Sequence, residues 1–302
     1  MIVLSLFDGM SCGRLALQKA GIPIKKYYAS EIDKYAIKVA KANFSDTIHV
    51  GDVSELIWYD KYLHKHLQPD IDLLIGGSPC QGFSFSGQRL NFDDPRSKLF
   101  FEFVRLMDET KPRWFLLENV SMKKESKDII SRYMGVEPVM INSNLVSAQN
   151  RKRLYWTNIP FTMPEDRGIM LKDIIEDKAH CLDANYFKGG NLSALKNYFE
   201  KSNQEVLIVQ RPRGQNKFGY RALDGKTPTL SSNAWEQNNF LVNPETLKWR
   251  KLTPLECERL QTVPEGYTAH VSNTQRYKML GNGWTVDVVA HIFKGLKDYA
   301  RV

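Results

Sequence analysis

The chain has 302 residues, of which 42% are hydrophobic and 25% charged, and its formal net charge is +8. These proportions are those of an ordinary globular protein and exclude a largely disordered chain. The length allows one large catalytic domain or a large domain that carries a smaller one. The excess of 42 Lys and Arg over 34 Asp and Glu permits attraction to a polyanion, although a merely soluble basic protein shows the same excess.

The N-terminal segment lacks the basic start and the uninterrupted apolar run of a signal peptide. No 18 consecutive residues are apolar, so we expect a soluble protein of the cytoplasm. The four cysteines form no CxxC pair and no Cys/His cluster, which predicts reduced thiols and no metal site. They are Cys12, Cys80, Cys181 and Cys257.

The first half of the chain alternates apolar runs with helical periodicity. The runs predict strands at residues 2–7, 27–30, 71–75 and 114–117. Helices with one apolar face are expected between them, one after Asp33 as a possible N-cap and one after Ser97. Alternation of strands and helices predicts an α/β fold with a mostly parallel sheet.

From about Asn158 to Trp249 the pattern breaks into short segments rich in Asn, Gly and Pro. This change predicts a second, loop-rich domain. Regular structure returns at Thr253, because Pro254 at the first helical position and Glu256 at the third match a capping box.

The last stretch has apolar residues at helical spacing, and we expect this helix to pack back on the sheet. These residues are Val286, Val289, Ile292, Phe293 and Leu296. We therefore assign residues 1–158 and 275–302 to a discontinuous catalytic and cofactor-binding domain. Residues 159–274 are assigned to the second domain.

A glycine turn and an acid follow the first two predicted strands, and a second acid ends a further apolar run at Asp52. The turn Phe7–Gly9 precedes a helix near Gly13, where a ligand can approach the backbone, although its spacing is not the dinucleotide fingerprint and a plain structural turn stays open. The Glu31 carboxylate suits two ribose hydroxyls and Asp52 suits an adenine amino group. Either acid alone could equally cap a helix. Together they suggest an adenosine, which both nicotinamide and methyl-transfer enzymes bind.

A cysteine and a carboxylate are predicted to meet at the same edge of the sheet. Cys80 follows the run 71–75 behind the rigid Pro79, and Glu118 follows the run 114–117. Residues 82–98 are polar and aromatic with flanking glycine, which predicts a mobile lid. A lone cysteine is more often buried and inert, but an acid facing the same pocket favours chemistry.

GGSPCQGFS, ENV and QNRKR resemble the motifs of the cytosine carbon-5 DNA methyltransferase family, in the family's order. The resemblance extends to FDG, LTPLECERLQ and the terminal GNGWTV, and it covers about two-thirds of the chain. SLFDG, VGD and LFFEF are closest to the branch of the animal de novo DNA methyltransferases. QNRKR and the lid are closer to the bacterial and phage enzymes.

The resemblance implies an S-adenosylmethionine-dependent Rossmann-like domain and a smaller target-recognition domain. Cys80 would add to carbon 6 of a cytosine flipped out of duplex DNA, so that carbon 5 attacks the methyl group. Glu118 would contact ring nitrogen 3 and the 4-amino group, and Arg153 the carbonyl oxygen. The cofactor residues carried over are Phe7, Asp8, Gly9, Glu31, Ile32, Asp52, Val53, Asn282, Gly283 and Trp284.

Residues expected to touch DNA lie in the lid and in the irregular region, where a solvated polar loop is the ordinary alternative. They are Ser84, Gln88, Arg96, Arg211, Arg213, Lys217, Arg221 and Thr229. The expected partner is double-stranded DNA, bound by a monomer, with a cognate restriction endonuclease as a separate protein. The resemblance does not imply which sequence is recognised.

Three alternatives remain open. A transfer RNA cytosine methyltransferase has the same fold, but the CFT tripeptide of that branch is absent from this sequence. A catalytically silent DNA-binding module would not need Cys80 and Glu118. A nicotinamide oxidoreductase would need its own glycine fingerprint.

Overall fold

The computed structural model describes residues 1–60, 65–66, 69–78, 95–175, 207–209, 225–230, 240–242 and 249–299. The chain divides into two compact units. The first unit consists of Met1–Asn142, Lys152–Pro164 and Val286–Val302, and the second of Ser143–Arg151 and Glu165–Thr285. Residues 143–151 and 275–285, which the sequence interpretation assigns to the catalytic domain, belong to the second unit. In the described part of the chain, no helix is long and apolar enough to cross a membrane.

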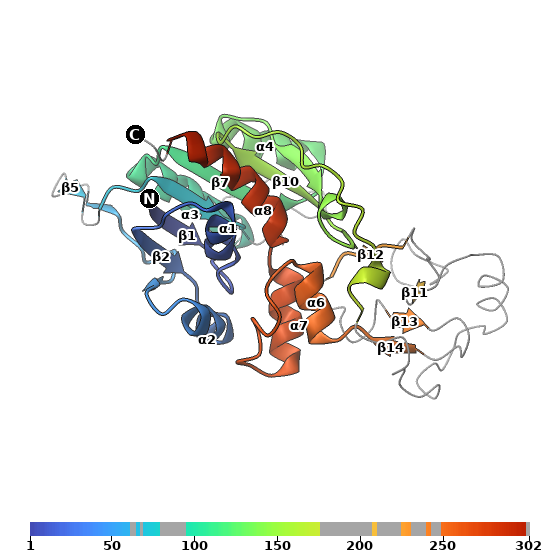
Figure 1. Ribbon diagram of the computed structural model, residues 1–302. Coiled ribbons are helices and arrows are strands. Elements are labelled where there is room, and N and C mark those ends of the chain that lie inside the picture. Colours follow the sequence, from blue (N-terminus) through green and yellow to red (C-terminus); the bar gives the residue numbers. More distant parts are fainter. Residues whose placement is uncertain are drawn as a thin grey trace. The chain divides into compact units, whose positions relative to one another are not determined.

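The first unit is built on a seven-stranded sheet with the order β3-β2-β1-β6-β7-β10-β8. Neighbouring strands from β3 to β7 run parallel, and β10 runs antiparallel to both β7 and β8 (Figure 1). The expected α/β fold with a mostly parallel sheet is confirmed. The strands are β1 Ile2–Leu6, β2 Lys26–Ser30, β3 Ile48–Gly51, β6 Leu73–Gly76, β7 Trp114–Val120, β8 Val139–Asn142 and β10 Lys152–Thr157.

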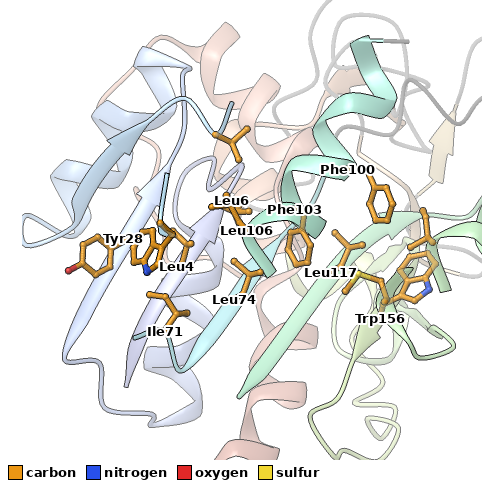
Figure 2. Packing of buried hydrophobic residues seen from close by; sticks show 14 of the residues in the cluster. Leu4, Leu6, Tyr28, Ile71, Leu74, Phe100, Phe103, Leu106, Leu117 and Trp156 are labelled. Atoms are coloured by element: carbon orange, nitrogen blue, oxygen red, sulfur yellow. The ribbon is translucent and has the colours of Figure 1, made fainter. Parts of the chain in front are cut away.

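Helix α3 (Pro95–Thr110) packs its apolar face on the sheet. Figure 2 shows Phe103 of this helix beside Leu74 and Leu117 of the strands, and all three side chains are fully buried. Near-continuous apolar strands such as β6 are expected where a parallel sheet is covered on both faces. This core fixes the sheet edge where the predicted site residues follow the strands.

The first residues of the helices test the predictions that were made from helix-capping residues. Asp33 caps α2 (Lys34–Asn43), as predicted, by accepting from the amides of Tyr35 and Ala36. The predicted start of α3 after Ser97 is wrong, because the helix already begins at Pro95. Proline suits a first helical position, where its missing N–H costs no hydrogen bond.

The chain returns to the first unit at its end. Helix α8 (Val286–Phe293) packs against α1 (Cys12–Ala20) (Figure 1). Lys19 of α1 pairs with Asp287 of α8 at 2.7 Å. Val286, Val289 and the following Leu296 are fully buried. Other elements of this unit are β4 Tyr59–Asp60, β5 Lys65–His66, α4 Lys124–Met134 and the 3-10 segment Lys294–Tyr299.

In its described residues, the second unit contains short strands and two helices. Strand β9 pairs with β12, and β13 lies between β11 and β14. The elements are the 3-10 segments Ser143–Leu145 and Leu171–Asp173, β9 Gln149–Asn150, β11 Leu207–Val209, β12 Thr227–Pro228, β13 Phe240–Val242, β14 Trp249–Lys251, α6 Pro254–Leu260 and α7 Asn273–Asn282.

Helix α6 begins with the predicted capping box and carries two fully buried acids. The Thr253 hydroxyl accepts from the Glu256 amide at 3.1 Å, and Glu256 accepts from the Thr253 amide at 2.8 Å. Both oxygens of Glu256 also accept from Arg250, at 2.7 and 2.6 Å. Glu258 accepts from the amides of Gly266 and Thr268 and from Arg276. Such complete pairing is what two buried carboxylates require.

Candidate active site

The turn after β1 has an unusual backbone. Phe7, Gly9 and Ser11 have φ of 57, 58 and 63°, in the left-handed region that side chains other than glycine rarely adopt. The turn is held by the Asp8 amide, which donates to the Ser30 carbonyl at 3.1 Å. A Cβ placed on Gly9 would meet no atom within 4 Å, so the space above this glycine is open. Strained backbone beside open space is common at ligand sites.

The Asp8 side chain points away from water. It is 8% exposed and accepts hydrogen bonds from the Tyr27 hydroxyl at 2.8 Å and from the Ser11 hydroxyl. Burial is the main reason why the pKa of this carboxyl rises to about 6, against the lowering effect of its hydroxyl partners.

Glu31 and Asp52 follow β2 and β3, as predicted. Glu31 accepts from the Gly9 amide at 2.7 Å with one oxygen, and from the amides of Ile32 and Asp33 at 2.8 Å with the other. It is therefore fixed in orientation beside the first turn. Asp52 accepts from the Ser54 amide and hydroxyl, and these bonds hold its pKa below the usual value. This carboxylate stays an acceptor at neutral pH.

The residues at these strand ends fit an adenosine. Ile32 is an apolar side chain that is 74% exposed, which leaves it available to cover a flat ring, whereas Val53 is buried. Glu31 offers acceptor oxygens of the kind a ribose needs, and Asp52 offers one for an exocyclic amino group. The first turn, with its open Gly9, completes the set on the same unit.

Arg105 on α3 supports the segment after β3, a contact that the sequence interpretation missed. Its guanidinium donates to the carbonyls of Val53 at 3.1 Å and Leu56 at 2.8 Å. Glu102 and Glu109 hold the guanidinium from α3 itself, at 2.8 and 2.5 Å. An arginine spacing of i, i+3 and i, i+4 to two acids looks like ordinary surface pairing, so the sequence carries no signal for its bonds to a distant loop.

Glu118 and Arg153 meet across neighbouring strands. Glu118 lies near the end of β7, Arg153 lies near the start of the antiparallel β10, and the Arg153 Nε is 2.9 Å from a Glu118 oxygen. Both side chains are largely buried, 10% and 13% exposed respectively. Arg153 also donates from Nη1 to the carbonyl of Lys152 at 2.8 Å. Within the described residues, its Nη2 group donates no hydrogen bond.

Asn119, the neighbour of Glu118, ties β7 to the segment that leads to the predicted nucleophile. Its amide nitrogen lies 3.3 Å from both the carbonyl and the hydroxyl oxygen of Ser78. Asn119 is 2% exposed and Ser78 5%. Cys80 itself lies outside the described residues. The last described residues before it are thus anchored beside Glu118.

In the second unit, Arg151 joins three backbone segments. Its guanidinium donates to the carbonyls of Leu230 at 2.9 Å, Gly281 at 3.1 Å and Gly283 at 2.9 Å. It therefore braces the turn Asn282–Trp284 against the segment that contains Thr229. The Thr229 hydroxyl donates to the Asn150 carbonyl at 2.6 Å, and Trp284 is half-buried.

Comparisons with known proteins match the whole chain. The model of the C-5 cytosine-specific DNA methylase family matches residues 1–298. The chain belongs to this family. It is 32% identical to the Type II methyltransferase M1.ScrFI of Lactococcus lactis subsp. cremoris, over 95% of this chain and 75% of the relative.

Solved structures agree with the family's fold. A protein described as a DNA modification methyltransferase encoded within a prophage of E. coli has a TM-score of 0.67 and 25% identity, with 99% of each chain covered. A DNMT2 variant of Spodoptera frugiperda has a TM-score of 0.63 and 20% identity, over 98% of this chain and 99% of that chain, and shows the fold alone. The chain is accordingly a methyltransferase that acts on carbon 5 of cytosine in DNA.

Several predicted residues of this methyltransferase stay predictions because they lie outside the described residues. In addition to Cys80, these are Ser84, Gln88, Arg211, Arg213, Lys217 and Arg221. Arg96 is the second residue of α3, and its side chain is not described. Among the described residues, no group of three His, Cys, Asp or Glu side chains is arranged to hold a metal ion.

Proposed function

We propose that this methyltransferase transfers the methyl group of S-adenosylmethionine to a cytosine flipped out of a specific duplex DNA sequence, through a covalent bond to Cys80. The observation that carries the proposal is the Glu118–Arg153 pair at 2.9 Å, with Asn119 holding Ser78 two residues before Cys80. A nucleophile, an acid and a guanidinium on adjoining segments of one unit are the groups that activation of a cytosine ring requires.

Cys80 supplies the nucleophile. Carbon 5 of cytosine is a poor nucleophile. Addition of a thiolate to carbon 6 converts the ring into an enamine, whose carbon 5 can attack a methyl donor. A free thiol with a pKa of about 8.5 is only a few per cent ionised near pH 7. Full ionisation of the thiol would therefore raise the reaction rate only some tens-fold. Activation of the cytosine ring must contribute more.

Glu118 and Arg153 activate the ring. In its protonated form, Glu118 donates a hydrogen bond to ring nitrogen 3 and accepts one from the 4-amino group, which stabilises the ring once Cys80 has added. The Arg153 guanidinium, oriented by its bond to Glu118, places its remaining donors toward the carbonyl oxygen of the base. A water molecule then takes the proton from carbon 5, and the electrons of that C–H bond re-form the ring double bond as the Cys80 thiolate leaves.

S-adenosylmethionine, when bound, supplies an electrophilic methyl group on a positively charged sulfur. Glu31 would accept from the ribose hydroxyls, Asp52 from the adenine amino group, and Ile32 would cover the adenine ring. Phe7, Asp8 and Gly9 would surround the methionine part from the first turn, and Val53 would line the adenine side. The family motif implies that Asn282, Gly283 and Trp284 would also contact the cofactor.

Recognition of the DNA is assigned to residues 159–274, with residues 1–158 and 275–302 as the catalytic domain. The basic residues from Arg211 to Arg221 would hold phosphates and base edges, and Thr229 would lie next to the flipped base. Ser84, Gln88 and Arg96 would contact the DNA from the lid. Flipping costs a few kcal/mol, which pocket contacts offset.

We further propose a monomer, since flipping one base needs one active site. The name of the relative M1.ScrFI supports a restriction-modification role alongside a separate endonuclease. Another relative is an orphan methyltransferase of Bacillus phage SPR. The proposed role therefore extends to the modification of phage DNA. These bacterial and phage relatives support action on DNA in the bacterial cytoplasm.

The first experiment incubates the wild type and Cys80→Ala with tritiated S-adenosylmethionine and, separately, unmethylated duplex DNA or transfer RNA. The product is digested to nucleosides and the labelled base identified. We expect label in 5-methylcytosine from DNA with the wild type and none with Cys80→Ala. Label in RNA alone would overturn the DNA assignment in favour of a transfer RNA methyltransferase.

A covalent trap tests the role of Cys80 separately from turnover. Duplex DNA with 5-fluorocytosine at the target blocks loss of the carbon 5 substituent, so the enzyme should stay bound through the thioether. We expect a denaturation-resistant complex with the wild type, but none with Cys80→Ala despite equal DNA binding. Methylation by Cys80→Ala at the wild-type rate would contradict the assigned nucleophile.

A further inference from the structure

Asp8 is a buried carboxylate whose partners are hydroxyls. It accepts from Tyr27 at 2.8 Å and from Ser11, and Ser5 is a further side-chain partner. Among the described residues, no Lys, Arg or His forms an ion pair with it. Hydroxyl donors stabilise a buried negative charge less than a cation would, so much of the electrostatic attraction of this carboxylate stays available.

The charged groups around Asp8 leave the turn negative. Glu31, which follows β2, adds a second carboxylate and accepts from the Gly9 amide in the same turn. Arg14 on α1 lies over the Tyr27 ring, 5.4 Å from its centroid, but its guanidinium donates to both oxygens of Asp46 at 2.6 Å. The charge of Arg14 is therefore directed at Asp46.

The backbone keeps Asp8 in place. Its neighbours Phe7 and Gly9 are both left-handed, and its own amide and carbonyl bond to Ser30 and Ser11. Because the backbone of Asp8 is fixed on both sides and its carboxylate is bonded to Tyr27 on β2, the side chain has little freedom to turn toward water. The negative charge consequently stays buried beside the first turn.

We propose that Asp8, with Glu31 beside it, makes the first turn prefer a positively charged cofactor, so that the Asp8 charge sets the preference for S-adenosylmethionine over S-adenosylhomocysteine. This inference rests on the proposed function. The two ligands differ by the methyl group and the positive charge on sulfur. A buried negative charge attracts that cation through a medium of low dielectric constant, where screening is weak. The product would be released more readily than the donor.

The preference depends on pH. Burial raises the pKa of Asp8 to about 6, so the carboxylate is mostly ionised at pH 8 and mostly protonated at pH 5. A bound cation favours the ionised form and lowers this pKa. By linkage, the affinity for the cation falls below pH 6 by up to about tenfold for each unit of that lowering. The uncharged sulfur of the product brings no such dependence.

The test measures the Kd of S-adenosylmethionine and of S-adenosylhomocysteine for the full chain by calorimetry between pH 5 and 8. The quantity of interest is the ratio of the two Kd values, because effects common to both ligands cancel. The variants are Asp8→Asn, which removes the charge and keeps the shape, and Asp128→Asn, a matched change at an exposed position on α4.

We expect the wild-type preference for the donor to fall severalfold from pH 8 to pH 5. Asp8→Asn should show the low preference at every pH, and Asp128→Asn should follow the wild type. The inference is overturned if Asp8→Asn at pH 8 prefers the donor as strongly as the wild type does, or if the wild-type ratio of the two Kd values is independent of pH. Absence of binding by either ligand at all pH values would instead contradict the proposed cofactor.

Folding of the variant is checked by its unfolding midpoint. Since burial raises the pKa of Asp8, ionisation of this group opposes folding above pH 6, and Asp8→Asn should unfold at a higher temperature than the wild type at pH 8. A second variant, Tyr27→Phe, removes one donor to the carboxylate and raises its pKa further. In Tyr27→Phe the pH at which the preference falls should move upward, and an unchanged midpoint would contradict the role of Asp8.

Discussion

The buried acids of α6 differ from those at the edge of the first unit's sheet. Glu256 and Glu258 are fully buried, and each is matched by an arginine and by backbone amides. Asp8 and Glu118 are also buried, each 8% exposed, but Asp8 has hydroxyl partners, and among the described residues Glu118 contacts the guanidinium of Arg153 alone.

This difference separates acids that maintain the fold from acids that act on ligands. A carboxylate whose lone pairs are all used stabilises its surroundings and has nothing left to offer a ligand. Even the thiol between the two α6 acids is inert, because burial and the neighbouring carboxylates raise the pKa of Cys257. A buried carboxylate with unused acceptor sites destabilises the fold. This cost suggests that such a residue is retained because it is needed for function.

The largest effect is expected at Glu118. Glu118→Gln keeps the shape but cannot exchange a proton with the ring, so the methylation rate should fall by about 10²–10⁴-fold. Single-turnover transfer of tritiated methyl groups measures this loss. The Kd for S-adenosylmethionine should stay near the wild type, as should all properties of Glu125→Gln on α4. Because Arg153 loses its negative partner, the free energy of unfolding should fall, but by less than the activation free energy of methylation rises. A loss of folding equal to the loss of rate would place Glu118 with the α6 acids.

The reverse outcome is expected at Glu256. Glu256→Gln leaves the buried Arg250 without its negative partner, and removing one member of a buried pair costs about 3–5 kcal/mol. Urea unfolding measures the free energy. The matched control is Glu265→Gln, which breaks the pair of Arg259 with a 59% exposed glutamate and should cost less than about 1 kcal/mol. Equal costs for the two variants would contradict the structural role of the α6 pair.

Arg105 both maintains the fold and supports the proposed cofactor site, because acids bind its guanidinium and it in turn holds the segment after Asp52. Arg105→Met removes its bonds to the Val53 and Leu56 carbonyls, and the Kd for S-adenosylmethionine should rise about tenfold, which corresponds to about 1.4 kcal/mol. The rate at saturating cofactor should change little. Arg132→Met, an exposed position on α4, serves as control. A lower rate with unchanged Kd would place the effect of Arg105 elsewhere.

The smallest effect is expected at Ser78. Ser78→Ala removes one of the two Asn119 contacts, which is worth about 1 kcal/mol, and leaves the carbonyl contact in place. The methylation rate should fall by less than about tenfold, with unchanged affinity for the cofactor. Stopped assays over a range of cofactor concentrations separate the two parameters. A full loss of activity would show that the hydroxyl itself takes part in the chemistry.

The sequence predicts what local rules determine. Asp33 and Thr253 cap helices as their spacing indicates, and Glu31 and Asp52 follow the strands where they were expected. The family was predicted from motifs in a fixed order and the α/β fold from the alternation of strands and helices, and both are confirmed. Helix α3 begins three residues earlier than expected, because Pro95 suits the first helical position.

Long-range contacts account for the rest. The contact of Asn119 with Ser78 spans 41 residues, and that of Arg105 with Val53 spans 52. Neither leaves a periodic signal in the sequence. The antiparallel strand β10 was not predicted, so the approach of Arg153 to Glu118 was implied only by family resemblance. The burial of Asp8 likewise depends on Tyr27, 19 residues away.

The return of α8 to α1 also has a consequence for how the protein folds. Lys19 and its partner Asp287 are separated by 268 positions, so the face of α1 that packs on α8 has no cover until nearly the whole chain has been synthesised. Contacts between distant parts of a chain form slowly, and exposed apolar surface promotes aggregation in the meantime. The first unit thus cannot complete its folding until α8 has been synthesised, although its first strand is made first.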